Sequence, residues 1–378
     1  MLNKYIDQLR RNFTRRSLLQ GLAAGMLTMT VEGCAQALSD QSTATPIPTP
    51  HRPGSVLSTY SGHKARVTSV GWSPNGKYIA SGSLDKTVQI WAANPNDHVQ
   101  PFIYRGHAEG VQAVAWSPES DRVVSGSLDK TVQVWEALTG EHTAIYKGHS
   151  DIVMTVAWSP DGKFIASGSA DGTVRVWDVT TAQQKYSYHG HQASVHTLAW
   201  SPDSQRIASG AEDKTVQIQD ATNGKTLYTY HGHSSTVSTV GWSPDGKYIA
   251  SGSWDKTVQV WNATTGVVLY IYNGYNVQVA KINSSKGVLP DLIHALAWSH
   301  NGKRIAAITQ MYCGDICAVM LAWDAYSEQN FSFYVDMPAF AVAWSPDDTR
   351  LVTAITVSSA ELSDSSQGNG SFAQIVQA

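Results

Sequence analysis

The chain has 378 residues, of which 42% are hydrophobic and 15% are charged, and its formal net charge is −3. This apolar content is enough for a large core, and an all-β chain of this length can fold as one domain. The near-neutral charge gives no overall attraction to nucleic acid, so we expect no nucleic-acid partner. The three cysteines, Cys34, Cys313 and Cys317, are too few for a disulfide framework.

The first 31 residues have the pattern of an export signal. Residues 1–17 carry five basic side chains against one acid, and residues 18–31 are apolar and uncharged. This apolar run is short for a membrane span, which needs ~20 residues. The stretch Thr-Arg-Arg-Ser-Leu-Leu-Gln resembles the twin-arginine (Tat) export motif of bacteria, with Arg15 and Arg16 as its arginine pair. The alternative for this segment is a basic amphipathic helix.

Cys34 follows the residues Val-Glu-Gly, and this context resembles a lipobox. The resemblance implies cleavage before Cys34 and lipidation of its thiol, although Glu32 stands where a small or apolar residue is usual. Ordinary cleavage near residues 35–37 and an uncleaved anchor are the alternatives. Two acyl chains on Cys34 would hold the protein stably at a membrane surface.

Prolines punctuate a Ser- and Thr-rich stretch between the signal and the rest of the chain, at positions 46, 48, 50 and 53. Such a composition has no hydrophobic face and is typical of an extended, semi-rigid linker. We therefore expect three parts: a signal peptide over residues 1–33, a linker over residues 34–55 and a folded domain over residues 56–378.

The remainder of the chain is a tandem repeat, which is the first feature to test in any sequence. Trp-Ser-Pro or a close variant occurs seven times, mostly about 42 residues apart. Each copy alternates apolar and polar residues over four short runs, for example 237–242, 247–252, 257–261 and 268–272, with turn residues between them. The tryptophan of each such segment should end the first strand of its copy. These tryptophans are Trp72, Trp116, Trp158, Trp200, Trp242, Trp298 and Trp344.

Gly-His pairs precede five of the copies, and a Trp-Asp pair ends the third, as Trp177-Asp178. With these marks the chain resembles WD-repeat β-propeller proteins over roughly residues 56–378. The Trp-Ser-Pro-Asp-Gly segments also resemble TolB-type propeller repeats, but the Gly-His and Trp-Asp marks favour the WD type. The resemblance implies an all-β fold: a seven-bladed β-propeller with four antiparallel strands in each blade.

Counting strands predicts how the ring closes. The seventh copy supplies only three strands, near residues 340–344, 350–355 and 372–377. The missing strand is residues 56–60, which directly precede the first Gly-His pair. The N-terminal strand should therefore join the last blade and remove the open edge.

Four copies carry His, Ser, Asp and Trp at fixed offsets. A Ser-His-Asp set invites a hydrolase reading, but an active site occurs once, whereas this set recurs with the blade. Its chemistry suits a buried relay of hydrogen bonds, and the WD-repeat resemblance implies the same structural tetrad. The sets are His63, Ser81, Asp85 and Trp91; His107, Ser125, Asp129 and Trp135; His149, Ser167, Asp171 and Trp177; and His233, Ser251, Asp255 and Trp261.

The fourth copy has Gln219 in place of the tetrad tryptophan, so we expect His191, Ser209 and Asp213 to lose one donor and this blade to be the least stable of the regular five. One histidine of each His-Gly-His segment, 189–191 and 231–233, belongs to a tetrad. We therefore expect no metal site and no cofactor.

A basic residue follows each first Trp by five or six positions, where a turn should expose it. Carboxylates accompany these residues, so a mixed, solvated ring is favoured over a phosphate-binding ring. The residues are Lys77, Arg122, Lys163, Arg206, Lys247, Lys303 and Arg350.

Departures from the repeat are the functional signal, because insertions in such proteins map to loops on one face. Three of them, at residues 274–291, 309–317 and 357–371, should lie at the same end of the ring. Cys313 and Cys317 flank one of these loops and would form a disulfide in an exported protein. The alternative is drift in surface loops that have no role.

The aspartate of each tetrad lies in the turn after the second strand, and the residue before it should be exposed at this same end of the ring. In the fifth copy that residue is Trp254, the one tryptophan outside the two repeated Trp positions. An exposed Trp with neighbouring Leu is typical of a contact hot spot. We predict a partner-binding face there, made by Trp254, Leu84, Leu128, Arg66, Ile152 and Glu212.

These observations predict a monomeric, non-enzymatic scaffold that binds a protein or peptide, is exported across a bacterial cytoplasmic membrane, and touches the membrane only through its signal or a lipid anchor. A module that binds a small ligand or glycan through the central channel and the long loops is the alternative. An enzyme comes third, because no unique acid pair, nucleophile elbow or phosphate loop supports it.

Overall fold

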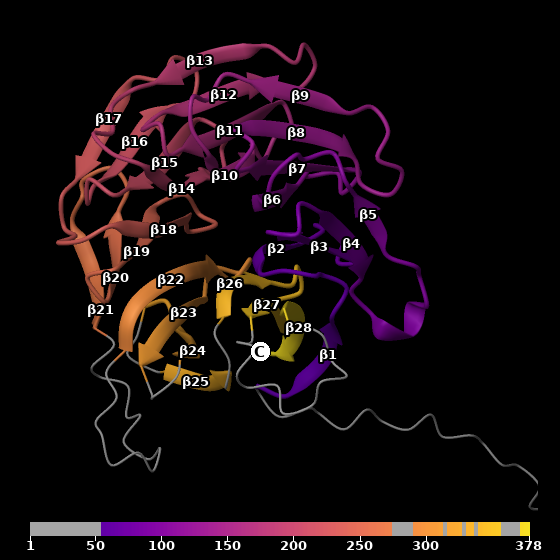
Figure 1. Cartoon of the computed structure of the whole chain (residues 1–378). Helices are drawn as coiled ribbons and strands as arrows, with labels where there is room; N and C mark the ends of the chain where they lie inside the picture. The colour runs from indigo at the N-terminus through magenta and orange to yellow at the C-terminus, as the bar shows by residue number, and fades with distance from the viewer. Residues whose placement is uncertain (1–53, 274–289, 313–315, 327–329, 336–338, 357–370) are drawn as a thin grey trace, which may run out of the picture. The chain divides into compact units, whose positions relative to one another are not determined.

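The structure is a computed structural model that describes residues 54–273, 290–312, 316–326, 330–335, 339–356 and 371–378 (Figure 1). These residues belong to one compact unit, Pro50–Ala378, and the second unit, Met1–Thr49, lies outside the described residues. Within the described part of the chain, no helix has both the length and the apolar character needed to cross a membrane.

Seven four-stranded antiparallel sheets form the blades of a propeller, which confirms the predicted fold. A short 3-10 turn, Pro95–Asp97, lies within blade 1. Blades 1 to 4, each given from its innermost to its outermost strand, consist of β2 (Val67–Trp72), β3 (Tyr78–Ser83), β4 (Val88–Ala92) and β5 (Phe102–Tyr104); β6 (Val111–Trp116), β7 (Arg122–Ser127), β8 (Thr131–Glu136) and β9 (Ala144–Lys147); β10 (Val153–Trp158), β11 (Phe164–Ser169), β12 (Val174–Asp178) and β13 (Gln184–Tyr188); and β14 (Val195–Trp200), β15 (Arg206–Ala211), β16 (Val216–Asp220) and β17 (Thr226–Tyr230).

Blades 5 to 7 follow the same plan, except that the outermost strand of blade 7 comes from the start of the chain. They consist of β18 (Val237–Trp242), β19 (Tyr248–Ser253), β20 (Thr257–Asn262) and β21 (Val268–Asn273); β22 (Pro290–Trp298), β23 (Arg304–Tyr312), β24 (Ile316–Asp324) and β25 (Asn330–Val335); and β26 (Ala339–Trp344), β27 (Arg350–Thr356), β28 (Ser371–Gln377) and β1 (Val56–Tyr60).

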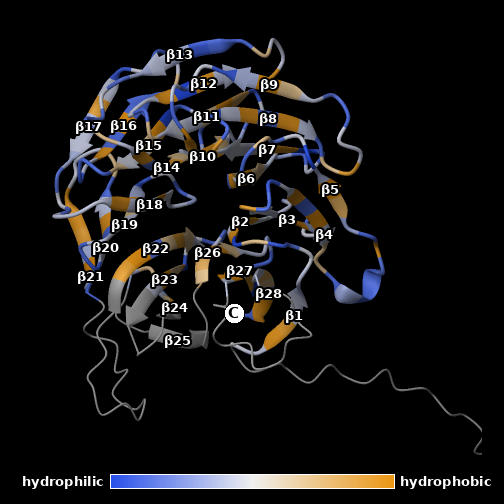
Figure 2. Ribbon diagram, in the orientation of Figure 1, coloured by the Kyte–Doolittle hydropathy of each residue, from blue (hydrophilic) through white to orange (hydrophobic). Residues whose placement is uncertain are grey.

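The hydrophobic core is divided among the gaps between blades. Each of seven clusters of buried side chains is drawn from two adjacent blades, including blades 7 and 1. For this reason the inner strands are buried on both faces: five of the six residues of β19 are buried. The outer strand β13 is largely hydrophilic, whereas the innermost strand β22 is largely hydrophobic (Figure 2). A blade therefore depends on its neighbours for its stability.

The N-terminal strand closes the ring as the strand count predicts. β1 pairs antiparallel with β28, with Thr59 opposite Gln374 and Tyr60 opposite Ala373. Leu57 and Tyr60 also pack against the core between blades 7 and 1. One end of the described propeller is thus fastened to the other by both hydrogen bonds and apolar contacts.

Tryptophans at the ends of the innermost strands join each blade to the one before it. The indole of Trp242 donates a hydrogen bond to the Ala199 carbonyl of blade 4 at 3.2 Å, and the Arg206 guanidinium of blade 4 lies 4.5 Å from the centre of the same indole ring. Indoles donate in the same way to the preceding blade in four further places, from Trp116, Trp200, Trp298 and Trp344.

The arginine stacking corrects the expectation of a ring of seven exposed basic residues. Guanidinium groups that lie six positions after a first Trp stack on the next blade's indole, at Arg122, Arg206, Arg304 and Arg350. The lysines that lie five positions after it are exposed, at Lys77, Lys163, Lys247 and Lys303. A shift of one position thus separates an interblade contact from a solvated turn.

Deleting residues 56–60 should destabilise the whole ring, because it exposes the β28 edge and uncovers the core between blades 7 and 1. We expect the thermal midpoint to fall by about 5–10 °C, since ~1 kcal/mol shifts Tm by about 2–4 °C in domains of 150–250 residues. Circular dichroism melts of the full chain and the deletion variant would measure this. Deletion of residues 41–45 is the control. An unchanged, cooperative melt of the 56–60 deletion would contradict the role of β1 in closing the ring.

Candidate partner-binding face

The predicted tetrads recur in the first five blades as networks of buried side chains. In blade 5, His233 Nε2 lies 2.8 Å from Ser251 Oγ and His233 Nδ1 lies 2.8 Å from Asp255 Oδ2. The Trp261 indole donates to Ser251 Oγ at 3.1 Å. Because Ser251 has an exposed fraction of 0%, no substrate carbonyl can reach its hydroxyl. The equivalent serines of blades 1 to 4 are equally buried, so this geometry is structural: Ser81, Ser125, Ser167 and Ser209.

Two blades depart from the expected donor pattern. In blade 4 the Gln219 side chain donates to Ser209 Oγ at 2.7 Å, so the expectation that this tetrad loses a donor is wrong. An amide N–H replaces the indole N–H, although Gln219 Oε1 is buried without a hydrogen-bond partner. In blade 2 the Trp135 indole has no hydrogen-bond partner and instead stacks on Tyr104, with ring centres 3.8 Å apart.

Hydrogen bonding keeps the tetrad carboxylates ionised. Burial alone would raise the pKa of Asp255, but hydrogen bonds from His233 and Thr257 outweigh burial and lower its pKa to about 2. A similar balance, with a bond from Thr173, lowers the pKa of Asp171 to about 2. The pKa values of the equivalent carboxyls also lie well below their usual range, at Asp85, Asp129 and Asp213. Each ionised carboxylate accepts a backbone N–H after its histidine and so fixes that loop.

The free energy of unfolding should fall as the pH is lowered from about 4 towards 2. A folded pKa of about 2, against about 3.9 in the unfolded chain, gives stability that is present above about pH 4 and lost as protons bind. Urea unfolding measured at a series of pH values would show this. Asp255→Asn should cost about 1–3 kcal/mol at pH 7 and flatten the pH dependence. A constant stability between pH 4 and 2 would contradict the role of these carboxylates.

The predicted binding residues lie where the innermost strand of a blade begins and its second strand ends. The Leu84 N–H donates to the Arg66 carbonyl at 2.9 Å, which sets these two residues side by side in blade 1. Corresponding bonds join Ala170 to Ile152, Glu212 to Ser194 and Trp254 to Thr236. We call this end of the blades the rim face and define it by Arg66, Leu84, Gly110, Leu128, Ile152, His196, Glu212, Trp254, His294 and Phe340.

An arginine stacked on a phenylalanine joins blades 1 and 7 on the rim face. The Arg66 guanidinium lies 3.7 Å from the centre of the Phe340 ring, and the His294 ring of blade 6 meets Phe340 edge-on at 5.7 Å. Desolvation lowers the pKa of Arg66. Among the described residues no carboxylate forms an ion pair with Arg66. The edge of a guanidinium carries N–H groups that match a carboxylate with two parallel hydrogen bonds.

Blades 4 and 5 contribute a second aromatic pair. The Trp254 side chain, which is 37% exposed, meets the His196 ring edge-on at 5.7 Å. Burial lowers the pKa of His196, and the charge of Glu212 opposes this shift. The exposed indole of Trp254 therefore lies next to the imidazole of His196, which is close to the carboxylate of Glu212.

Leucines from blades 1 and 2 converge on a glycine. A Cβ placed on Gly110 would lie 2.9 Å from Leu84 Cδ2 and 3.2 Å from Leu128 Cδ1, so a larger residue would have to displace these two side chains. Leu84 is exposed, whereas Leu128 and Ala170 are half-buried, which corrects the expectation that the residues before the tetrad aspartates are all exposed. Ile152, which precedes the innermost strand of blade 3, is also half-buried.

The sequence reasoning missed His196, His294, Phe340 and Gly110. The first three share one repeat position, directly after the first buried residue of the innermost strand, and the other copies carry Thr68, Gln112, Met154 and Ser238 there. No two neighbouring blades have the same residue at this position. That variation, within an otherwise regular repeat, is the signal that could have identified them.

Several predicted features lie outside the described residues. These are Arg15, Arg16, Cys34, Cys313 and residues 274–289 and 357–370. Cys317 pairs with Met311 in the β23–β24 ladder, but its side chain lies outside the described part of the structure. Export, lipidation and the Cys313–Cys317 disulfide therefore remain predictions.

Comparison with known proteins identifies the repeats. The family model described as "WD domain, G-beta repeat" matches residues 54–92, 99–136, 140–178, 182–220 and 224–262, which together make about half of the chain. The chain is 51% identical over 39 residues to THO complex subunit 3 of Arabidopsis thaliana, which is 10% of this chain and 12% of that protein. It is 60% identical over 37 residues to Actin-interacting protein 1 of Drosophila melanogaster, 10% of this chain and 6% of that protein.

A third relative, the ribosome biogenesis protein BOP1 homolog of Monosiga brevicollis, is 50% identical over 44 residues, 12% of this chain and 5% of that protein. The chain thus spans an eighth or less of the length of these relatives, and each match is about one repeat long. Each of the five matched repeats contains the residues of one tetrad, together with the outermost strand of the blade before. The chain therefore belongs to the WD domain, G-beta repeat family.

Proposed function

We propose that this protein is a non-enzymatic scaffold that binds a protein or peptide through the rim face. The observation that carries the proposal is Arg66, an exposed cation that stacks on Phe340 and has no acidic partner among the described residues. A guanidinium forms strong, charge-assisted hydrogen bonds with a carboxylate, so a ligand that supplies an anion would be stabilised there. Names such as "complex subunit" and "interacting protein" among the relatives support a binding role.

The chemistry of the rim face indicates what a partner presents. A carboxylate could form two parallel hydrogen bonds with the edge of the Arg66 guanidinium while Phe340 covers its face. Apolar side chains would fit against Leu84 and Trp254, which are 36% and 37% exposed. These contacts spread over separate blades, which suits an extended peptide or protein surface better than a compact small molecule.

A glycan is the second candidate, because an exposed Trp beside a histidine could also stack on a sugar ring. The alternatives are separated by probing the immobilised full chain with envelope proteins and, in parallel, with a glycan array. Sugar binding without any protein capture would overturn the preferred function.

Rim-face variants should lose the captured partner. We expect Arg66→Ala and Trp254→Ala each to weaken capture by about tenfold or more, which is the effect of removing a hot-spot side chain worth ~2 kcal/mol. Leu138→Ala, which removes an exposed leucine in the turn between β8 and β9 at the opposite end of blade 2, is the matched control. Quantitative pull-down at several protein concentrations measures the change. Equal losses in all three variants, or none in the rim variants, would contradict the proposal.

We also propose that the protein is exported by the twin-arginine route and held at the membrane surface by a lipidated Cys34. The support is the Arg15-Arg16 pair, the apolar run over residues 18–31 and the proline-rich linker. The propeller would then work outside the cytoplasmic membrane as a monomer, with membrane contact only through the signal or lipid.

Replacing both arginines, as Arg15→Lys with Arg16→Lys, should retain the protein inside bacterial cells, because the export machinery reads the arginine pair. Cys34→Ala should still be exported but should move from the membrane fraction to the soluble fraction. Cell fractionation with immunodetection measures both effects, and Lys4→Arg is the control. Unchanged export of the double-lysine variant would contradict the twin-arginine assignment.

A further inference from the structure

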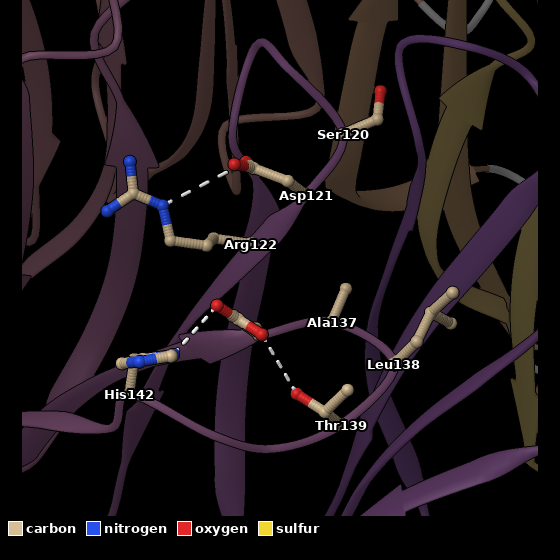
Figure 3. Close-up of a pocket in the computed structure, with 8 residues that line it drawn as sticks. Ser120, Asp121, Arg122, Ala137, Leu138, Thr139 and His142 are labelled. Carbon is tan, nitrogen blue, oxygen red and sulfur yellow. Dashed lines mark hydrogen bonds and ion pairs between the residues drawn. The ribbon is translucent and has the colours of Figure 1, made fainter.

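The turn that links β8 to β9 gathers three side chains of metal-binding type. The ligand atoms of Glu136, Glu141 and His142 all lie within 4.8 Å of one another. His142 Nδ1 lies 2.7 Å from Glu136 Oε1, and the Thr139 hydroxyl donates to Glu136 Oε2 at 3.1 Å (Figure 3). The turn is at the opposite end of the blade from the rim face, so this site is independent of the proposed function.

The Glu136 side chain makes different hydrogen bonds from the equivalent residues of the other blades. In blades 3 and 5 the equivalent Asp178 and Asn262 accept hydrogen bonds from two backbone N–H groups of their own turn. In blade 4 the equivalent Asp220 accepts from the backbone and hydroxyl of Thr222. The longer side chain of Glu136 bonds instead to His142 and Thr139. Its carboxylate therefore faces other side chains and is available to a cation.

His142 is also placed differently from its counterparts. Residues at its position begin the outer strand in blades 3 to 5, at Gln184, Thr226 and Val268, but in blade 2 that strand begins two residues later, at Ala144. His142 has a left-handed backbone with φ of 51°, and this turn of the chain brings its ring to the Glu136 carboxylate. The His142 side chain is 76% exposed, so an ion in solution can reach it.

Two backbone hydrogen bonds hold the turn that carries these groups. The Glu136 N–H donates to the Glu141 carbonyl at 3.0 Å, and the Gly140 N–H donates to the Glu136 carbonyl at 2.9 Å. Glu136 and His142 border an open hollow of about 650 Å³, whose wall also includes Ser120, Asp121 and Leu138 (Figure 3). Ligands from the two ends of a closed turn lose little freedom when they bind an ion.

We propose that Glu136, Glu141 and His142 bind one divalent transition-metal ion, with Zn²⁺ as the preferred ion and water completing the coordination. One imidazole and two carboxylates form a donor set that suits Zn²⁺, whereas Mg²⁺ and Ca²⁺ prefer oxygen ligands alone. In a tetrahedral site with bonds of about 2.0–2.2 Å, the nitrogen and oxygen ligands lie about 3.3 Å apart. The 2.7 Å separation between His142 and Glu136 therefore has to open only slightly.

Zinc titration of the untagged full chain, after removal of metals by a chelator, tests the proposal. Isothermal calorimetry with ZnCl₂ should detect a site that His142→Asn and Glu136→Gln each weaken at least about tenfold. His189→Asn, which removes an exposed histidine from the loop between β13 of blade 3 and β14 of blade 4, should leave that site unchanged. Circular dichroism checks that each variant folds. MgCl₂ in place of ZnCl₂ should give no comparable binding.

The outcome is decided by comparing the variants, because other histidines and the cysteines of the chain can also take up zinc. A zinc isotherm that is the same in the unmodified protein, His142→Asn and Glu136→Gln would overturn the proposal, as would the absence of any zinc binding. X-ray absorption at the zinc edge gives a second readout. It should show one imidazole nitrogen among oxygen ligands, and sulfur or several imidazoles would contradict the site.

Discussion

The contact between successive blades is the interaction on which the whole structure depends. A four-stranded blade has two apolar faces and no means of burying them alone, so every core lies between two blades. The tryptophan that ends each innermost strand strengthens this contact: Trp242 and Trp344, for example, donate to a carbonyl of the blade before and receive its arginine on the ring. Because each blade supports the next, closure by β1 matters to all seven.

The regular residues of the repeat serve this architecture, and we infer that the irregular ones serve function. Ser251 and Asp255 are held inside blade 5 by His233, and the serine is fully buried, so a set of residues that looks catalytic in sequence is structural in place. The rim face shows the opposite behaviour, since the side chains of Arg66 and Trp254 differ from those at the same repeat positions in other blades and present cationic and aromatic surface. The Glu136 turn follows the same principle at the other end of blade 2, because it differs from its counterparts.

Most of the architecture could be predicted from the sequence, because repetition shows each pattern several times. The number of blades and the closure of the ring by β1 follow from counting strands. Counting does not show that one N–H donor can replace another, so the amide of Gln219 was not expected to take the place of an indole. Composition also does not reveal a one-residue offset: Arg206 begins the second strand of its blade, whereas Lys247 lies in the turn just before that strand. The pairing of Arg66 with Phe340 was beyond prediction, because ring closure brings together residues 274 positions apart in the sequence.

The central claim is that binding resides in departures from the repeat on the rim face. Hydroxyl-radical footprinting of the full chain, with and without its captured partner, tests this most directly, because exposed Leu, Trp, Tyr and Phe side chains all react. We expect the partner to protect Leu84, Trp254 and Phe340 from oxidation, while Leu138 and Tyr326, exposed at the other end of the blades, react as before. Protection of Leu138 and Tyr326 with unchanged oxidation of Trp254 would contradict it.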